Sequence, residues 1–264
     1  MSQLNAPTVS IITPSYNAER LIGRTLQSVL DQSWQDWELL VIDDCSKDGT
    51  RDVVSQYAAM DSRIRLIALD KNNGAPAAPR NIGVREARGQ WIAFLDADDI
   101  WHPEKLALQM IAAHEKSGEF MSTQMLDFID DTLLVFSPVG QAPVGQVTFA
   151  QQRIKGRIPT SSVLVTKDLM LKFPFNEDIR YKAVEDYHCW LRILRSGVSH
   201  WKVQYPLLSY RRIVGQISGS KKYMLERMLM VHREFPQTSR LQAALYTLTH
   251  AAGGFYYRIL RKGL

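Results

Sequence analysis

The chain has 264 residues, of which 45% are hydrophobic and 22% charged, and its net charge at pH 7 is +5. This length and composition exclude a disordered protein and favour one large α/β domain, or one domain with an appendage, whose mild basicity suits a phosphorylated substrate, nucleic acid or an anionic membrane surface equally well. Two cysteines without metal-ligand spacing, no secretory signal and no apolar run of membrane-spanning length favour a cytoplasmic protein.

Short apolar runs alternate with helical patterns over the first hundred residues. Four strands are predicted at residues 9–13, 39–42, 64–69 and 91–95. Helices are predicted between them, the first with Asn17 as its N-cap and the third over residues 80–87, after a loop at residues 70–79. This alternation predicts right-handed parallel crossovers and a doubly wound sheet.

Polar residues follow each predicted strand. They are Pro14, Ser15, Tyr16 and Asn17 after the first, Asp43 and Asp44 after the second, residues 72–80 after the third, and Asp96, Asp98 and Asp99 after the fourth. Ligands of open α/β sheets bind beyond the carboxyl ends of the strands, so we expect all four groups to meet at one edge of the sheet.

The last of these groups, D-A-D-D, packs three carboxylates within four residues. Because clustered carboxylates repel one another, a fold that places them at the end of a buried strand indicates a site for a divalent cation, which would in turn hold phosphates. The alternative is that Asp99 caps the following segment and Asp96 is solvated in a loop.

Four segments carry a resemblance to a known family. They are V-S-I-I-T-P-S-Y-N-A, W-E-L-L-V-I-D-D-C-S-K-D-G-T, N-N-G-A-P-A-A-P-R-N-I-G-V and G-Q-W-I-A-F-L-D-A-D-D. The chain resembles glycosyltransferase family 2, the inverting sugar-nucleotide-dependent enzymes of GT-A fold, closely over residues 8–110. The resemblance implies a Rossmann-like mixed sheet in two halves, a nucleotide-sugar-binding half at 1–110 and an acceptor-binding half at 111–215, with a helical extension at 216–264.

The resemblance also implies a donor site. Pro14, Ser15 and Tyr16 would line the nucleoside pocket, and Asp44 would accept hydrogen bonds from a uracil edge. Tyr16 could instead be a core aromatic, and Asp44 a turn residue. The remaining donor contacts would come from Asn17, Asp43, Arg80 near the diphosphate, and Asp96 and Ala97 near the turn or the donor sugar. A solvated arginine at a helix start is the alternative for Arg80.

Asp98 and Asp99 would bind Mn²⁺ or Mg²⁺ between the two phosphates. In the second half, V-E-D-Y followed by W-L-R resembles the family's E-D motif on a helix. Asp186 is then the candidate base that takes the acceptor proton, and Glu185 would orient the acceptor or a backbone amide. A like-charged neighbour should make one of the two harder to ionise. The alternative is two acids favoured in a first helical turn by the helix dipole.

Two later segments carry further expectations. Residues 210–215 with Ser218 resemble a loop that closes over the donor, which would make Arg211 or Arg212 a diphosphate ligand. Two helices are predicted after residue 221, and the ending F-Y-Y-R-I-L-R-K-G-L would suit an interfacial anchor. It would equally suit packing on the catalytic domain or on a second subunit.

The implied reaction moves one sugar from a UDP-sugar to a hydroxyl of a glycan or an undecaprenyl-diphosphate-linked saccharide in bacterial surface polysaccharide or O-antigen synthesis, on the cytoplasmic side. No nucleic-acid partner is expected, and peripheral membrane contact would be through the C-terminal segment. The alternatives are a nucleotidyl or phosphoryl transferase, for which no P-loop sequence is visible, and a non-catalytic nucleotide-binding scaffold.

Overall fold

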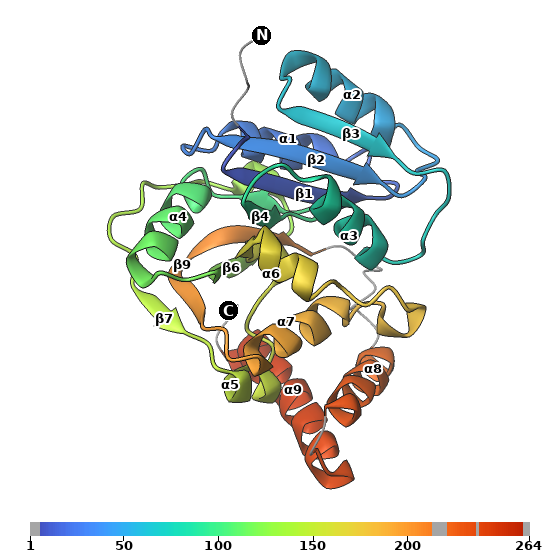
Figure 1. The fold of residues 1–264 in the computed structure, drawn as a ribbon, viewed down its shortest axis with the longest axis vertical. Coiled ribbons are helices and arrows are strands. Elements are labelled where there is room, and N and C mark those ends of the chain that lie inside the picture. Colours follow the sequence, from blue (N-terminus) through green and yellow to red (C-terminus); the bar gives the residue numbers. More distant parts are fainter. Residues whose placement is uncertain (1–5, 213–220, 236–237, 261–264) are drawn as a thin grey trace.

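The computed structural model describes residues 6–212, 221–235 and 238–260, which are built around one nine-stranded sheet (Figure 1). The strands are β1 (Val9–Ser15), β2 (Trp37–Asp43), β3 (Ile64–Ala68), β4 (Trp91–Phe94), β5 (Ile100–Trp101), β6 (Phe120–Phe128), β7 (Val144–Gln146), β8 (Leu164–Thr166) and β9 (His200–Arg211). The helices are α1 (Ile22–Leu30), α2 (Thr50–Met60), α3 (Ala77–Glu86), α4 (Lys105–Lys116), α5 (Phe149–Ile154), α6 (Lys167–Lys172), α7 (Glu185–Arg195), α8 (Lys221–Glu234) and α9 (Arg240–Leu260).

The sheet order is β3-β2-β1-β4-β8-β6-β9-β5, and β7 pairs with β9. The first four strands in this order are parallel, which confirms the expected parallel arrangement. From β4 onward the sheet is mixed, because β8 pairs antiparallel with both β4 and β6, whereas β6 and β9 are parallel. The sheet therefore runs through both halves of the chain without a break.

Both faces of the parallel half are covered, which explains its unbroken apolar strands. Ile11 packs with Leu26 of α1 on one face, and the next residue, Ile12, packs with Val84 of α3 on the other. All seven residues of β2 are buried. A strand buried on both faces carries apolar side chains on both, so residues 39–42 in the middle of β2 form a continuous apolar run without alternation.

The loops after β1 and β3 correct two local predictions. Asn17 does not cap a helix: α1 begins at Ile22, with Leu21 in the N-cap position and no side-chain cap. Asn17 has φ of 49° and its Oδ1 accepts a hydrogen bond from the Lys47 amide at 2.8 Å, so it ties two loops together. The third helix begins at Ala77, three residues earlier than predicted, because a proline such as Pro79 is tolerated in a first helical turn.

Gly83 sets how closely α3 approaches the sheet. A Cβ atom at this position would lie 2.5 Å from Cγ2 of Ile12 in β1, so a larger residue would push the helix away. Arg80 lies on the same helix, three residues before Gly83. The close contact therefore fixes where the Arg80 side chain stands relative to the strand ends.

The C-terminal helices lie at the opposite end of the molecule from α2 and β3 (Figure 1). Met228, Val231 and Phe235 pack in one buried cluster with Tyr187 and Leu191 of α7, so α8 covers α7. None of the helices in the described ranges is long and apolar enough to cross a membrane. The expected anchor at residues 255–264 lies outside the described side chains, and residues 261–264 are not described.

Candidate functional site

A pocket of about 470 Å³ lies beyond the carboxyl ends of β1, β2 and β4. The predicted residues in its wall are Pro14, Ser15, Tyr16, Asn17, Asp44, Arg80, Asp96, Ala97 and Asp98. The loop after β3 adds further residues to the wall of this pocket: Asn72, Gly74, Ala75 and Pro76. All four polar groups predicted to converge at the sheet edge therefore contribute to one pocket.

Tyr16 presents an aromatic surface to this pocket. Its side chain is 50% exposed, which rules out the alternative of a core aromatic. Pro14 and Ser15, in contrast, belong to the end of β1 and hold the backbone in register with β2, Ser15 lying opposite Asp43. An exposed ring on a rigid strand end offers a face on which a planar base can stack.

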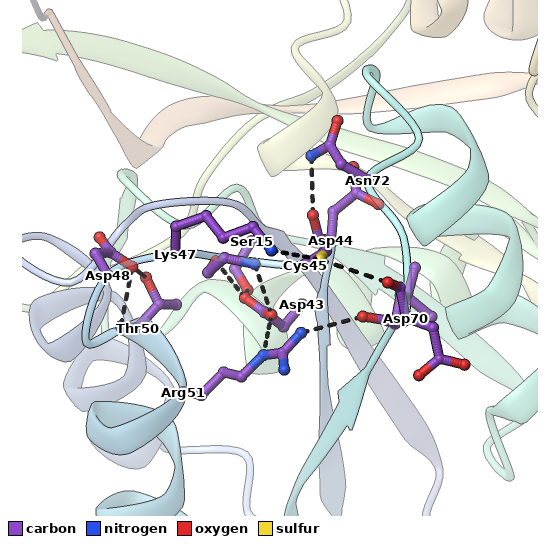
Figure 2. Close-up of polar contacts among 12 residues, drawn as sticks. Ser15, Asp43, Asp44, Cys45, Lys47, Asp48, Thr50, Arg51, Asp70 and Asn72 are labelled. Carbon is purple, nitrogen blue, oxygen red and sulfur yellow. Dashed lines mark hydrogen bonds and ion pairs between the residues drawn. The ribbon is translucent and has the colours of Figure 1, made fainter.

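Asp43 is enclosed behind the pocket and is not part of its lining. One carboxylate oxygen accepts hydrogen bonds from the Arg51 side chain at 2.6 Å and the Ser46 amide at 3.0 Å, and the other accepts from Ser15 at 3.3 Å (Figure 2). We expected Asp43 to contact the ligand directly, but its side chain is buried and does not line the pocket. Asp43 instead fixes the turn that carries the next residue, Asp44.

Asp44 reaches the pocket wall with a largely buried carboxylate. Its Oδ1 accepts hydrogen bonds from the Asn73 amide at 2.9 Å and from the Asn73 side chain at 2.6 Å. Its backbone carbonyl accepts a hydrogen bond from the Asn72 side chain at 2.8 Å (Figure 2). Asp44 thus holds the loop after β3, the turn role predicted as its alternative, and it also lines the pocket. Sequence reasoning did not single out Asn73, although an Asn-Gly pair marks its turn.

Arg80 is buried, only 4% exposed, and joins the two halves of the chain. One guanidinium nitrogen donates to Glu185 at 2.9 Å and another donates to Asp96 at 2.6 Å. These carboxylates raise the pKa of Arg80 despite its burial, so it stays charged. The alternative of a solvated arginine is ruled out. Arg80 also lines the pocket, so its side chain lies where the predicted contact with a diphosphate would form.

Glu185 is the member of the acidic pair that is harder to ionise. Burial raises its pKa to about 7, with a smaller contribution from Asp186, while Arg80 opposes the rise. Its Oε2 has no hydrogen-bond partner among the described residues. Both acids lie in the first turn of α7, where the sequence placed them.

The D-A-D-D segment divides into two environments. Asp96, with a side chain 31% exposed, and Asp98 line the pocket. Asp99 is fully enclosed, its Oδ1 accepts a hydrogen bond from the Arg211 amide at 3.0 Å, and burial raises its pKa well above the usual value. Asp99 therefore lies behind the pocket wall and not in it.

The residues present fit a Mg²⁺- or Mn²⁺-type site that is completed by its ligand. No group of three or more acidic, histidine or cysteine residues within the described ranges is arranged to hold a metal by itself. Mg²⁺ is usually held by one or two carboxylates together with substrate phosphates. Asp96 and Asp98 supply such oxygen donors at the pocket wall.

Asp186 opens onto a second pocket, of about 250 Å³, on the other side of residues 182–184. Its Oδ2 accepts a hydrogen bond from the Thr160 hydroxyl at 2.6 Å, and its Oδ1 accepts one from the Tyr187 amide at 2.6 Å. Lys182 lines the first pocket, and Ala183 and Val184 line the second. No sequence signal marked Lys182, which comes from an irregular segment.

Arg211 and Arg212 line a third hollow, of about 720 Å³, which shares Asn17, Ala18 and Leu21 with the first pocket. Arg211 donates from Nε to the Asp98 carbonyl at 2.8 Å, and Arg212 pairs with Asp127 at 3.4 Å. The two arginines therefore stand next to the first pocket without lining it. The rest of the predicted closing loop, residues 213–220, lies outside the described residues.

Comparison with known proteins adds the family. A model described as glycosyl transferase family 2 matches residues 10–165. A Bacillus subtilis (strain 168) protein named as a glycosyltransferase of teichuronic acid biosynthesis, TuaG, is 32% identical over 96% of this chain and 98% of its own length. An Escherichia coli protein, UDP-Glc:alpha-D-GlcNAc-diphosphoundecaprenol beta-1,3-glucosyltransferase WfgD, is 36% identical over 86% of each chain.

The fold is shared with a solved structure. That of S. aureus TarS 1-349 in complex with UDP-GlcNAc superposes with a TM-score of 0.72 at 20% identity, covering 97% of this chain and 77% of the other. At this identity the likeness concerns the arrangement of sheet and helices. It matches the mixed sheet described above.

Proposed function

Because the chain belongs to glycosyltransferase family 2, we propose that it transfers one sugar from a UDP-sugar, with metal dependence and inversion, to a hydroxyl of a lipid-linked saccharide during synthesis of a bacterial surface polysaccharide. The observation that carries this proposal is the placement of two pockets on either side of residues 182–184. One holds the exposed tyrosine and the acidic cluster, and the other holds Asp186. A donor and an acceptor need two such adjoining spaces.

The first pocket suits a nucleoside diphosphate sugar. Tyr16 offers a ring for base stacking, and Asp44 offers a carboxylate that can accept a hydrogen bond from the imide N–H of uracil. The names of WfgD and of the TarS complex include UDP-Glc and UDP-GlcNAc, which supports a uridine nucleotide here. Asp43 and Asn73 serve this site by holding the loops that carry Asp44.

Asp98, with Asp96 beside it, would hold a divalent cation at the diphosphate. When bound, the cation supplies positive charge where negative charge builds on the leaving diphosphate. Asp99 contributes from behind the wall, because its bond to the Arg211 amide fixes the turn that presents Asp98. Arg80 keeps Asp96 in place through their 2.6 Å contact.

Asp186 is placed to act as the base. The acceptor hydroxyl oxygen forms a bond to the anomeric carbon, the bond from that carbon to the diphosphate oxygen breaks with its electron pair leaving on the diphosphate, and the hydroxyl proton passes to the Asp186 carboxylate. Thr160 orients this carboxylate through their 2.6 Å hydrogen bond. Glu185 is not the proposed base, because it is buried and paired with Arg80.

The test is an Asp186→Asn variant, which keeps the shape of the side chain but cannot take the proton. We expect kcat to fall by about a hundred- to ten-thousandfold, the usual contribution of a positioned base, while UDP binding stays as in the wild type. The measurement is UDP release in the presence of acceptor, together with calorimetric UDP binding. Asp168→Asn, in the exposed first turn of α6, is the matched control. Turnover of Asp186→Asn at the wild-type rate would contradict this role.

A further inference from the structure

Two cationic side chains line the second pocket, and a third lies close to them. Lys155 follows α5, Arg157 lies two residues later in the loop, and Lys202 lies on β9. Lys202 Nζ donates a hydrogen bond to the Arg157 backbone carbonyl at 2.8 Å, which holds the Lys202 side chain against the backbone of Arg157. Arg157 and Lys202 line the pocket that contains Asp186, and Lys155 lies close behind them.

Two of these positive charges, Arg157 and Lys202, have no carboxylate partner among the described residues. Arg157 Nε is also buried without a hydrogen-bond partner in the described ranges. Gathering like charges in a partly buried space is unfavourable unless an opposite charge joins them. The arrangement is therefore complete only when an anion is present.

Part of the wall of the same pocket is apolar. Met125, Met224 and Met228 form part of its wall. Methionine side chains are flexible and polarisable, so they accommodate apolar groups of varied shape. A ligand that fills this pocket thus needs both an anionic group and apolar or uncharged surface.

We propose that this second pocket is an acceptor subsite in which Arg157 and Lys202 bind the phosphate groups of a sugar diphosphate ester, so that a hydroxyl of the attached sugar reaches Asp186. The inference rests on the proposed function, because it takes Asp186 as the base. The phosphates fix the acceptor at one end, and the sugar ring bridges from them to Asp186. The methionine part of the wall receives the group beyond the diphosphate.

Binding of an anion here should be linked to proton uptake. Burial, followed by Arg157 and then Lys202, lowers the pKa of Lys155 to about 8, and burial with Arg157 lowers that of Lys202 to about 8. A bound anion favours the charged forms, so both pKa values rise and protons are taken up at pH 8 but scarcely at pH 6.5.

The other titratable groups around the cluster are Asp186 and Tyr187 on α7 and His250 on α9. Burial lowers the pKa of His250 to about 4 and raises that of Tyr187, so neither changes its protonation near pH 8. The lysines are therefore the groups whose charge responds to an anion in this range.

The experiment is calorimetric titration of the full chain with dimethyl pyrophosphate, a diphosphate diester whose own charge does not change between pH 6.5 and pH 8, in EDTA, which removes metal from the donor side. We expect binding at pH 8, with an enthalpy that differs between two buffers of different ionisation enthalpy, and a much smaller difference at pH 6.5. Arg157→Gln and Lys202→Gln should each weaken binding about tenfold or more, the usual range for a hydrogen bond to a charged group. Lys172→Gln, exposed on α6, is the matched control and should leave binding unchanged.

Two results would overturn the subsite: no dimethyl pyrophosphate binding by the wild type, or equal affinity in the wild type and in both variants. The buffer comparison uses the wild type alone, so it decides the matter even where a variant fails to fold. Stabilisation by UDP with Mn²⁺ is measured separately. A protein that responds to UDP but not to dimethyl pyrophosphate would refute the subsite and leave the proposed function standing, whereas the reverse result would refute the donor assignment.

Discussion

Arg80 offers a sharp test of how the two halves of the chain are joined. Replacing it by methionine removes a guanidinium that contacts Glu185 at 2.9 Å and Asp96 at 2.6 Å, and leaves the buried Glu185 carboxyl without its partner. Breaking a buried ion pair by removing one partner typically costs about 3–5 kcal/mol. Since Asp96 is partly exposed and regains water, we expect Arg80→Met to lower the free energy of unfolding by about 3 kcal/mol at pH 8.

The stability lost in Arg80→Met should be larger at high pH than at low pH. Burial raises the pKa of Glu185 to about 7, and Arg80 opposes that rise, so its loss raises the pKa further. Between these two pKa values the folded variant binds a proton that the folded wild type has released. The wild type therefore gains stability relative to the variant as the pH rises above about 7, and Arg80→Met costs more at pH 8 than at pH 5.5.

Urea unfolding at the two pH values measures this effect. Arg180→Met is the control: Arg180 pairs with Asp178 at 2.6 Å on the surface, and its loss should leave stability nearly unchanged. A loss below about 1 kcal/mol in Arg80→Met, or an equal loss at pH 5.5 and pH 8, would refute the coupling of Arg80 to an ionisable Glu185.

Two further predictions concern the donor pocket. Tyr16→Ala should weaken UDP binding about tenfold, because stacking on an aromatic side chain contributes about 1–3 kcal/mol per base. Tyr16→Phe keeps the ring and should bind UDP as the wild type does. Calorimetry would measure both affinities, and a wild-type affinity in Tyr16→Ala would remove the stacking role. Asp98→Asn should abolish the increase in UDP affinity that Mn²⁺ produces, without changing the UDP affinity measured in EDTA. The same titration measures both affinities. A full Mn²⁺ response in this variant would show that other groups hold the cation.

Much of the parallel half of the fold could be predicted from local sequence patterns. A strand buried on both faces carries apolar side chains on both, and the polar residues that follow it lie at its carboxyl end, so Tyr16, Asp44 and Asp98 were placed correctly around one pocket. The same reasoning failed for Asn17, because an asparagine after a strand can cap a helix or bridge to another loop, and only the position of Lys47 decides which.

The contacts that span the two halves could not be predicted in this way. Arg80 and Glu185 are 105 residues apart, and no periodicity links them. The enclosure of Asp99 likewise depends on β9, which brings the Arg211 amide to its carboxylate. The second pocket combines a loop after α5 with α7, β9 and the C-terminal helices, so its cationic wall exists only in the folded chain.

The central claim is that the pocket at the strand ends binds a uridine diphosphate together with a divalent cation. The most direct measurement is thermal unfolding with UDP, GDP, CDP and dTDP, each with and without Mn²⁺. A ligand at a hundred times its Kd adds about 2.7 kcal/mol to the stability, which for a chain of this size corresponds to a rise in Tm of about 5 °C or more. We predict that rise for UDP with Mn²⁺ and a much smaller one for the other nucleotides. Equal rises for all four, or none for UDP with Mn²⁺, would contradict the account.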